Sequence, residues 1–208
     1  MKKDKFAWIT GGDEKYLEMI EVLAKSLLHY SSYKLIVYGF NCDSNINLPN
    51  VINRRVNFNQ HKKEDINCYT NNGEFDLRDK DYSIYFAKFL ANINSLNENY
   101  DKFAWIDGDA FVTSNIDKSL KYLDDLDDYP LFMRYFHHTM NNWKMVGDIK
   151  LEGEYGSELA NIKNIDRNPN NRIVAAGFYF YDKRSISFFK KCLKWNEELN
   201  HHSIKIWV

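Results

Sequence analysis

Two acidic residues, Asp107 and Asp109, directly follow the uncharged run Phe103–Ile106. A short apolar run of this kind is typical of a strand that is buried on both faces. Gly108, between the two acids, marks a point where the backbone bends or lies close to another group. If the segment stays extended, the carboxylates point to the same face, roughly 6–7 Å apart. Like charges so placed repel each other unless a cation lies between them. The pattern predicts a divalent cation site, and a pair of solvated loop aspartates is the alternative.

The six residues Asp-Lys-Phe-Ala-Trp-Ile occur twice, at 4–9 and at 101–106. Each copy is followed by glycine and aspartate, in 10–13 after the first and in 107–109 after the second. Strands that are buried on both faces tend to read alike, so this identity does not require a duplication. Ligands of open α/β sheets bind at the carboxyl ends of the strands. We therefore expect both segments to lie at the ligand-binding edge of one sheet.

Length and charge exclude several classes of protein. A chain of 208 residues suffices for one α/β domain with a substantial core. The net charge is −1, with 28 basic and 29 acidic side chains intermixed, so we expect no nucleic-acid partner. No apolar run approaches the ~18 residues of a membrane span. The three cysteines form no Cys-x-x-Cys pair, which favours a reducing compartment over a disulfide framework or zinc site. We expect a cytoplasmic protein.

Segments with strand-like and helix-like patterns alternate along the chain. Asp13 stands where a helix should begin, so its side chain is expected to accept hydrogen bonds from free amide groups there. Strands are predicted at 6–10, 34–40, 51–58, 103–106, 131–136 and 173–181. Helices are predicted at 13–30, 82–96, 117–126 and 185–199. Such alternation predicts the α/β class, with a doubly wound, mostly parallel sheet flanked by helices in a single domain of residues 1–208.

The order of these signals resembles the metal-dependent nucleotide-sugar glycosyltransferases of the GT-A fold, closest in pattern to the glycosyltransferase family 8 type. The first block that carries the resemblance is Thr10-Gly11-Gly12-Asp13-Glu14-Lys15-Tyr16, similar to the family's Asp-x-x-Tyr after the first strand. The resemblance implies that Asp13 meets the edge of the nucleobase and that Tyr16 stacks on it. Thr10, Gly11 and Gly12 would belong to the same donor site, because glycine lets the backbone approach a ligand closely.

Three further blocks follow in the family's order. Lys88, in the predicted helix before the Asp-x-Asp strand, stands where the family usually has arginine, which implies a contact near the donor sugar. The block of Asp107, Gly108 and Asp109 resembles the family's metal and diphosphate motif, which implies Mn²⁺ or Mg²⁺ held by the two carboxylates. In the last block, Ala176 and Gly177 resemble the strand that faces the transferred sugar and the acceptor, although Ala175 replaces the family's asparagine.

The resemblance also implies a functional division of the chain. Residues 1–113 would form the nucleotide-sugar-binding half, and residues 114–208 the acceptor-side half. Family members continue to a further polar motif and to a histidine that completes the metal site, whereas this chain ends at Val208. It would be either a natural minimal form or the amino-terminal portion of a longer enzyme. His201 and His202 are candidates for the missing ligand, and exposed terminal histidines are the alternative. No catalytic base is predicted.

The function so implied is transfer of a hexose from a nucleoside diphosphate sugar, with UDP expected, to a glycan or another hydroxyl acceptor. Two alternatives remain open from the residues. One is a non-catalytic nucleotide-sugar or glycan-binding domain with the same fold. The other is a magnesium-dependent phosphohydrolase of the haloacid dehalogenase type, which would want threonine or valine where this chain has Phe111.

Overall fold

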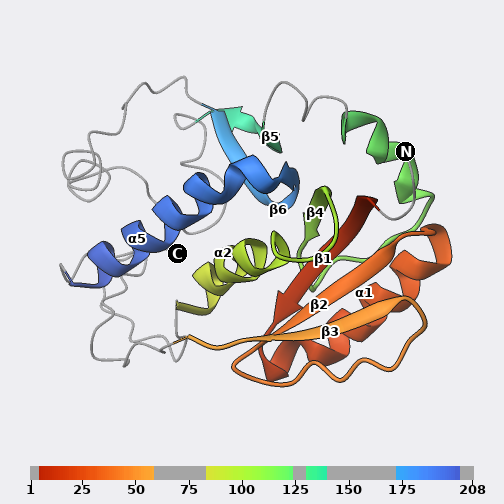
Figure 1. Ribbon diagram of the computed structural model, residues 1–208. Coiled ribbons are helices and arrows are strands. Elements are labelled where there is room, and N and C mark those ends of the chain that lie inside the picture. Colours follow the sequence, from red (N-terminus) through yellow and green to blue (C-terminus); the bar gives the residue numbers. More distant parts are fainter. Residues whose placement is uncertain (1–4, 59–82, 124–129, 140–171, 202–208) are drawn as a thin grey trace, which may run out of the picture. The chain divides into compact units, whose positions relative to one another are not determined.

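The computed structural model describes residues 5–58, 83–123, 130–139 and 172–201, and its strands and helices alternate as the sequence predicts (Figure 1). The strands are β1 (Phe6–Gly12), β2 (Lys34–Phe40), β3 (Val51–Val56), β4 (Lys102–Ile106), β5 (Leu131–Thr139) and β6 (Arg172–Asp182). The α-helices are α1 (Leu17–Tyr30), α2 (Ser83–Ser95) and α5 (Ile186–His201). The 3-10 helices are η2 (Glu14–Tyr16), η4 (Ile116–Leu123) and η6 (Lys183–Ser185). None of the helices in these ranges has the length and apolar character of a membrane span.

By compactness the chain divides into two units. The first comprises residues 1–60, 83–133 and 176–194, and the second comprises residues 61–82, 134–175 and 195–208. The residues predicted for the donor and sugar sites, together with Asp107 and Asp109, belong to the first unit, whereas the candidate ligands His201 and His202 belong to the second. The predicted division at residue 113 separates residues by the ligand that they would bind, whereas these two units are defined by compactness. That division therefore stays a prediction.

The sheet has the strand order β3-β2-β1-β4-β6-β5. β1 pairs in parallel with both β2 and β4, and β2 pairs in parallel with β3. β6 runs antiparallel to β4. The carboxyl ends of β1, β2, β3 and β4 therefore share one edge, and the antiparallel strand β6 brings the residues before Phe178 to that edge as well. The predicted doubly wound, mostly parallel sheet is confirmed.

Helices cover both faces of the sheet. On one face α1 packs through apolar side chains that include Ile20 and Leu27, next to Leu123 of η4. On the other face α2 packs through Ala87 and Ala91, and α5 contributes Phe189. Alternate residues along each strand supply the two cores, as the pleat of a strand requires.

The two copies of the hexapeptide lie side by side but one residue out of register. Trp8 is opposite Ala104, and Ile9 is opposite Trp105. Successive side chains of a strand point to opposite faces, so a shift of one residue turns identical sequences to opposite sides of the sheet. Trp8 accordingly packs with α1, and Trp105 packs on the α2 side.

Two local predictions are wrong. The segment after β4 forms the 3-10 helix η4 rather than an α-helix over 117–126. In a 3-10 helix side chains three residues apart line up, and Leu120 and Leu123 both meet the core in this way. The side chain of Asp13 makes no cap hydrogen bond, although its backbone carbonyl accepts the Tyr16 N–H at 3.0 Å.

Candidate functional site

The predicted site segments meet at the carboxyl edge of the sheet. Asp107 follows the last residue of β4, and its backbone N–H donates to the carbonyl oxygen of Gly177 on β6 at 2.9 Å. A Cβ placed on Gly108 would lie 2.7 Å from Cγ1 of Ile20 on α1 and 3.5 Å from the carbonyl oxygen of Gly11. Residue 108 therefore has to be small, because it lies between α1 and the end of β1. The structure brings the two polar strand ends and β6 together, as expected.

Two side chains hold one oxygen of the Asp107 carboxylate. The indole Nε1 of Trp105 donates to Oδ1 at 2.6 Å. The ammonium of Lys88, which projects from α2, lies 3.9 Å from the same oxygen. The Lys88 side chain is 19% exposed and that of Asp107 is 41% exposed, so the pair is only partly screened by water. Lys88 therefore lies at the Asp-Gly-Asp segment, and its contact with a donor sugar stays a prediction.

The other oxygen of Asp107 lies beside Gly177. A Cβ on Gly177 would lie 3.0 Å from Oδ2 and 3.6 Å from Cγ, and it would meet no other atom of the described residues within contact distance. A side chain at this position would therefore crowd the carboxylate and fill the space beside it. Its absence leaves Oδ2 accessible to a ligand or a cation.

The segment after Ile106 is not extended. The backbone N–H of Ala110 donates to the carbonyl oxygen of Asp107 at 3.1 Å, which closes a turn over Gly108 and Asp109. The strand-like spacing expected for the two carboxylates is therefore wrong. Asp109 is exposed and makes no hydrogen bond or ion pair within the part of the chain that the structure describes. Its carboxylate is thus available for a ligand.

The residues present fit part of a divalent cation site. Carboxylate oxygens are the ligands that Mg²⁺ and Mn²⁺ prefer, and Asp107 offers Oδ2 beside the space at Gly177. Residues 5–58, 83–123, 130–139 and 172–201 contain no group of three His, Cys, Asp or Glu side chains that could hold a metal ion. The remaining ligands of a bound cation would therefore be waters, a bound phosphate or residues outside these ranges.

The end of β1 carries a buried polar atom without a partner. Thr10 is fully buried, and its Oγ1 has no hydrogen-bond partner in the described structure. Gly11 is packed against the next strand, since a Cβ there would lie 2.7 Å from the carbonyl oxygen of Tyr38 and from the ring of Phe40. An unpaired buried hydroxyl is costly, so Thr10 marks a place where a donor or acceptor is needed.

Asp13 and Tyr16 both lie just after β1. Asp13 directly precedes η2, and Tyr16 is its last residue. A Cβ on Gly12 would lie only 2.8 Å from Cβ of Tyr16, so the aromatic side chain begins directly over the end of the strand. Tyr16 is 36% exposed. Oδ1 of Asp13 is buried and has no hydrogen-bond partner among the described residues. A partly exposed ring next to an unpaired carboxylate oxygen is suited to a flat ligand that carries hydrogen-bond donors on its edge.

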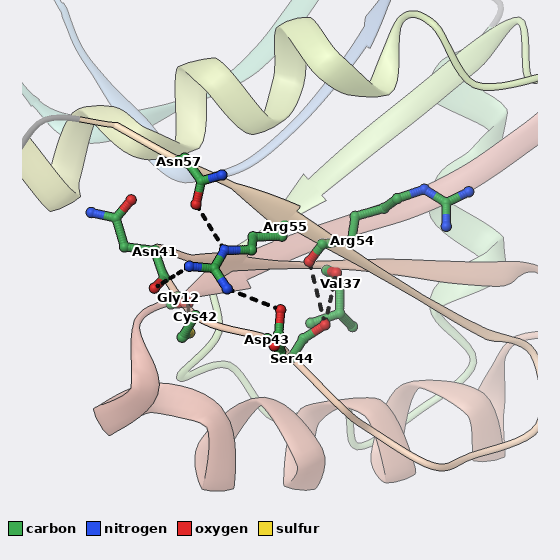
Figure 2. Close-up of polar contacts among 9 residues, drawn as sticks. All are labelled: Gly12, Val37, Asn41, Cys42, Asp43, Ser44, Arg54, Arg55 and Asn57. Atoms are coloured by element: carbon green, nitrogen blue, oxygen red, sulfur yellow. Dashed lines mark hydrogen bonds and ion pairs between the residues drawn. The ribbon is translucent and has the colours of Figure 1, made fainter.

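The loop after β2 closes over the end of β1. Arg55 of β3 donates to the side chains of Asn57 (2.7 Å) and Asp43 (3.2 Å) and to the backbone carbonyl of Asn41 (3.2 Å), as Figure 2 shows. These bonds hold the loop in place. The thiol of Cys42 then lies within 3.9 Å of the carbonyl oxygen of Gly12 (Figure 2).

Charge at this end of the sheet acts on the Cys42 thiol. Burial, and after it the carboxylates of Asp13 and Glu14, raises the pKa of Cys42 above its usual value. Arg55 opposes this shift. The Asp13 carboxylate therefore adds to the effect of burial on the pKa of this thiol.

Some predicted residues are described only in part. Ala176 lies in β6, next to Gly177, and His201 is the last residue of α5. His202 lies outside the described residues. The structure therefore does not test a histidine as the third metal ligand.

Sequence reasoning missed Trp105 as part of the site. It lies two residues before Asp107, so on an extended strand both side chains point to the same face. Spacing was a signal that could have found it. The loop after β2 was also missed as part of the site, because no local sequence pattern predicts the hydrogen bonds that Arg55 donates to it.

Comparisons with solved structures identify the fold. A bifunctional glycosyltransferase, WbbM, matches with a TM-score of 0.56 and 15% identity over 91% of this chain and 33% of that chain. The galactosyltransferase LgtC, solved in complex with donor and acceptor sugar analogues, matches with a TM-score of 0.53 and 16% identity over 92% of this chain and 64% of that chain. No protein-family profile and no curated protein sequence matches.

The chain thus spans a third of the WbbM chain and less than two thirds of the LgtC chain. At such low identity the likeness concerns the fold alone. The parallel strands β3, β2, β1 and β4, the antiparallel β6 and the helices on both faces are the elements that form this fold. The chain therefore has the GT-A fold of these glycosyltransferases.

Proposed function

We propose that this chain is a metal-dependent glycosyltransferase that moves a hexose from a nucleoside diphosphate sugar, UDP-linked, to a hydroxyl group of a glycan or another acceptor. The observation that carries the proposal is the position and orientation of the Asp107 carboxylate. Its carboxylate is fixed at the carboxyl edge of a GT-A sheet, with Oδ1 bonded and Oδ2 facing the space at Gly177.

The donor nucleotide binds at the end of β1. The ring of Tyr16 stacks on the base, and the unpaired Oδ1 of Asp13 accepts a hydrogen bond from the edge of the base. A uracil edge carries one N–H donor that suits a carboxylate acceptor. The ribose and the first phosphate would then lie beyond the carboxyl end of β1, because Phe40 and Tyr16 fill the positions beside Gly11 and Gly12.

The diphosphate binds at Asp107 and Asp109, which would hold Mn²⁺ or Mg²⁺. A bound divalent ion neutralises the charge that develops on the departing diphosphate. Lys88 adds a fixed positive charge 3.9 Å from Asp107, on the side of Oδ1. The hexose would lie toward Ala176 and Gly177 of β6, beside Asp107. Glycine at 177 keeps that space free of a side chain.

The test is a panel of nucleoside diphosphate hexoses, with Mn²⁺ or with EDTA, and release of the nucleoside diphosphate as the readout. UDP-hexose should be turned over only with the metal, and Asp109→Asn should abolish turnover. Asp101→Asn is the matched control, since Asp101 is an exposed aspartate at the opposite end of β4, paired with Lys5. Turnover by Asp109→Asn at the parent rate would refute the proposal.

A second candidate is a binding domain that holds nucleotide-sugar without transferring it. The absence of a three-residue metal group among the described residues favours it. Interactions that are equal in ground and transition states give binding without acceleration. Under this alternative, UDP-hexose would bind with Mn²⁺, and no nucleoside diphosphate would be released with any acceptor.

A further inference from the structure

Trp105 holds a fixed position beside the proposed metal site. It is 1% exposed, and its ring stacks on Tyr179 with ring centroids 6.4 Å apart and an angle of 15° between the planes. The indole has one polar hydrogen, on Nε1, and that hydrogen points at Oδ1 of Asp107 over 2.6 Å. Since the packed ring cannot turn, the direction of this hydrogen bond is fixed.

The two oxygens of Asp107 are consequently not equivalent. Oδ1 accepts from Trp105 and faces the ammonium of Lys88 at 3.9 Å. A cation that approached Oδ1 would meet the like charge of Lys88 and would have to share that oxygen with a charge-assisted hydrogen bond. Oδ2 lies beside Gly177 instead.

We propose that Trp105 is a positioning residue: its indole N–H fixes the Asp107 carboxylate so that Oδ2 alone binds a divalent cation. The inference rests on the proposed metal site and adds to it the group that orients the ligand. Partners that orient a ligand in this way typically change metal affinity by about 10- to 100-fold when they are removed.

Trp8 offers a matched control within the same chain. It occupies the equivalent place in the other copy of the hexapeptide and is also fully buried. Its indole Nε1 donates to Oγ of Ser31 at 2.8 Å, on the opposite face of the sheet. Replacing either tryptophan by phenylalanine removes one buried indole hydrogen bond and keeps an aromatic ring. Only the change at 105 removes a bond to Asp107.

The first measurement is Mn²⁺ affinity, by calorimetry on the full chain, for the parent, Trp105→Phe, Trp8→Phe and Asp107→Asn. Far-UV circular dichroism checks that each variant is folded. Trp105→Phe should weaken Mn²⁺ binding about 10- to 100-fold. Trp8→Phe should bind as the parent does, and Asp107→Asn should not bind. In EDTA the Tm should be similar for both tryptophan variants, which a general loss of structure at Trp105 would not permit.

The second measurement keeps the proposal testable if Trp105→Phe does not fold. The five tryptophans give separate indole N–H signals in a ¹H–¹⁵N spectrum. In Asp107→Asn the Trp105 signal should move upfield, because a neutral amide replaces the anionic acceptor, and the Trp8 signal should stay. In the parent, diamagnetic Mg²⁺ should shift the Trp105 signal more than that of Trp8.

The outcomes separate the two claims. Equal Mn²⁺ affinity in Trp105→Phe and the parent, or an unmoved Trp105 signal in Asp107→Asn, would overturn the positioning role and leave the proposed function standing. Failure of the parent to bind Mn²⁺ at all would contradict both the positioning role and the proposed function.

Discussion

Gly177→Ala tests whether the space beside Oδ2 of Asp107 serves a bound cation. The new Cβ would lie 3.0 Å from Oδ2, closer than ordinary contact, so the carboxylate must shift by a few tenths of an ångström. It cannot shift toward Trp105, because Oδ1 already lies 2.6 Å from Nε1. The carboxylate must therefore rotate away from the orientation that it has when residue 177 is glycine.

The change should cost little stability and much metal affinity. Alanine is favoured over glycine within a strand by roughly 0.5–1 kcal/mol, which offsets the crowding. We expect a Kd for Mn²⁺ about tenfold higher than that of the parent. At a concentration 100 times the parent's Kd, Mn²⁺ stabilises the parent by about 2.7 kcal/mol and the variant by about 1.4 kcal/mol. For a chain of this size the difference corresponds to roughly 3–5 °C in Tm.

The assay is thermal unfolding of both proteins with Mn²⁺ and with EDTA. The scan in EDTA supplies the baseline, in which the two Tm values should be nearly equal. A Mn²⁺-induced shift as large in Gly177→Ala as in the parent would refute the argument, because the space at residue 177 would then be unrelated to the cation.

Three further changes test neighbouring parts of the account. Tyr16→Ala should weaken UDP binding by roughly 5- to 100-fold in calorimetry, since stacking of a base on an aromatic ring contributes about 1–3 kcal/mol, and Tyr16→Phe should bind normally; normal binding by both would leave the ring without a role. Asn92→Ala removes the buried donor to the hydroxyl of Tyr179. The free energy of unfolding, measured in urea, should fall by about 1–3 kcal/mol, and Mn²⁺ affinity should stay the same. An unchanged free energy of unfolding would contradict that contact. Asp13 helps raise the pKa of the Cys42 thiol, so Asp13→Asn should lower that pKa and increase the thiolate fraction. Iodoacetamide should then alkylate Cys42 faster at a fixed pH, as measured by peptide mass spectrometry. An unchanged pH profile of alkylation would contradict the effect described for Asp13.

Local patterns predicted most of the elements and the edge at which the site forms. β2 spans the predicted range Lys34–Phe40, whose apolar run begins at Leu35. The uncharged run before Asp107 is a buried strand, and β1 lies beside it in parallel. These features follow from hydrophobic patterning and from the rule that parallel strands end at one edge, both of which are readable in the sequence.

Strand pairing and competing local hydrogen bonds decided what the sequence could not predict. The one-residue shift between the hexapeptide copies turns Trp8 and Trp105 to opposite faces, although their neighbours along the chain are identical. The turn closed by Ala110 replaced the extended geometry expected for the two carboxylates. The cap expected of the Asp13 side chain did not form; its own carbonyl accepts the Tyr16 amide, and the carboxylate oxygen Oδ1 is unpaired. In each case a competing hydrogen bond or a strand partner outweighed the local preference.

The most direct test of the central claim is the position of a bound metal ion. Crystals of the protein grown with UDP and Mn²⁺ should show an anomalous scattering peak about 2.0–2.6 Å from Oδ2 of Asp107 and from the carboxylate of Asp109. The UDP diphosphate should share that ion, and the base should lie on Tyr16. A peak beside Oδ1, a peak away from both aspartates, or UDP bound at this edge without any metal peak would contradict the account.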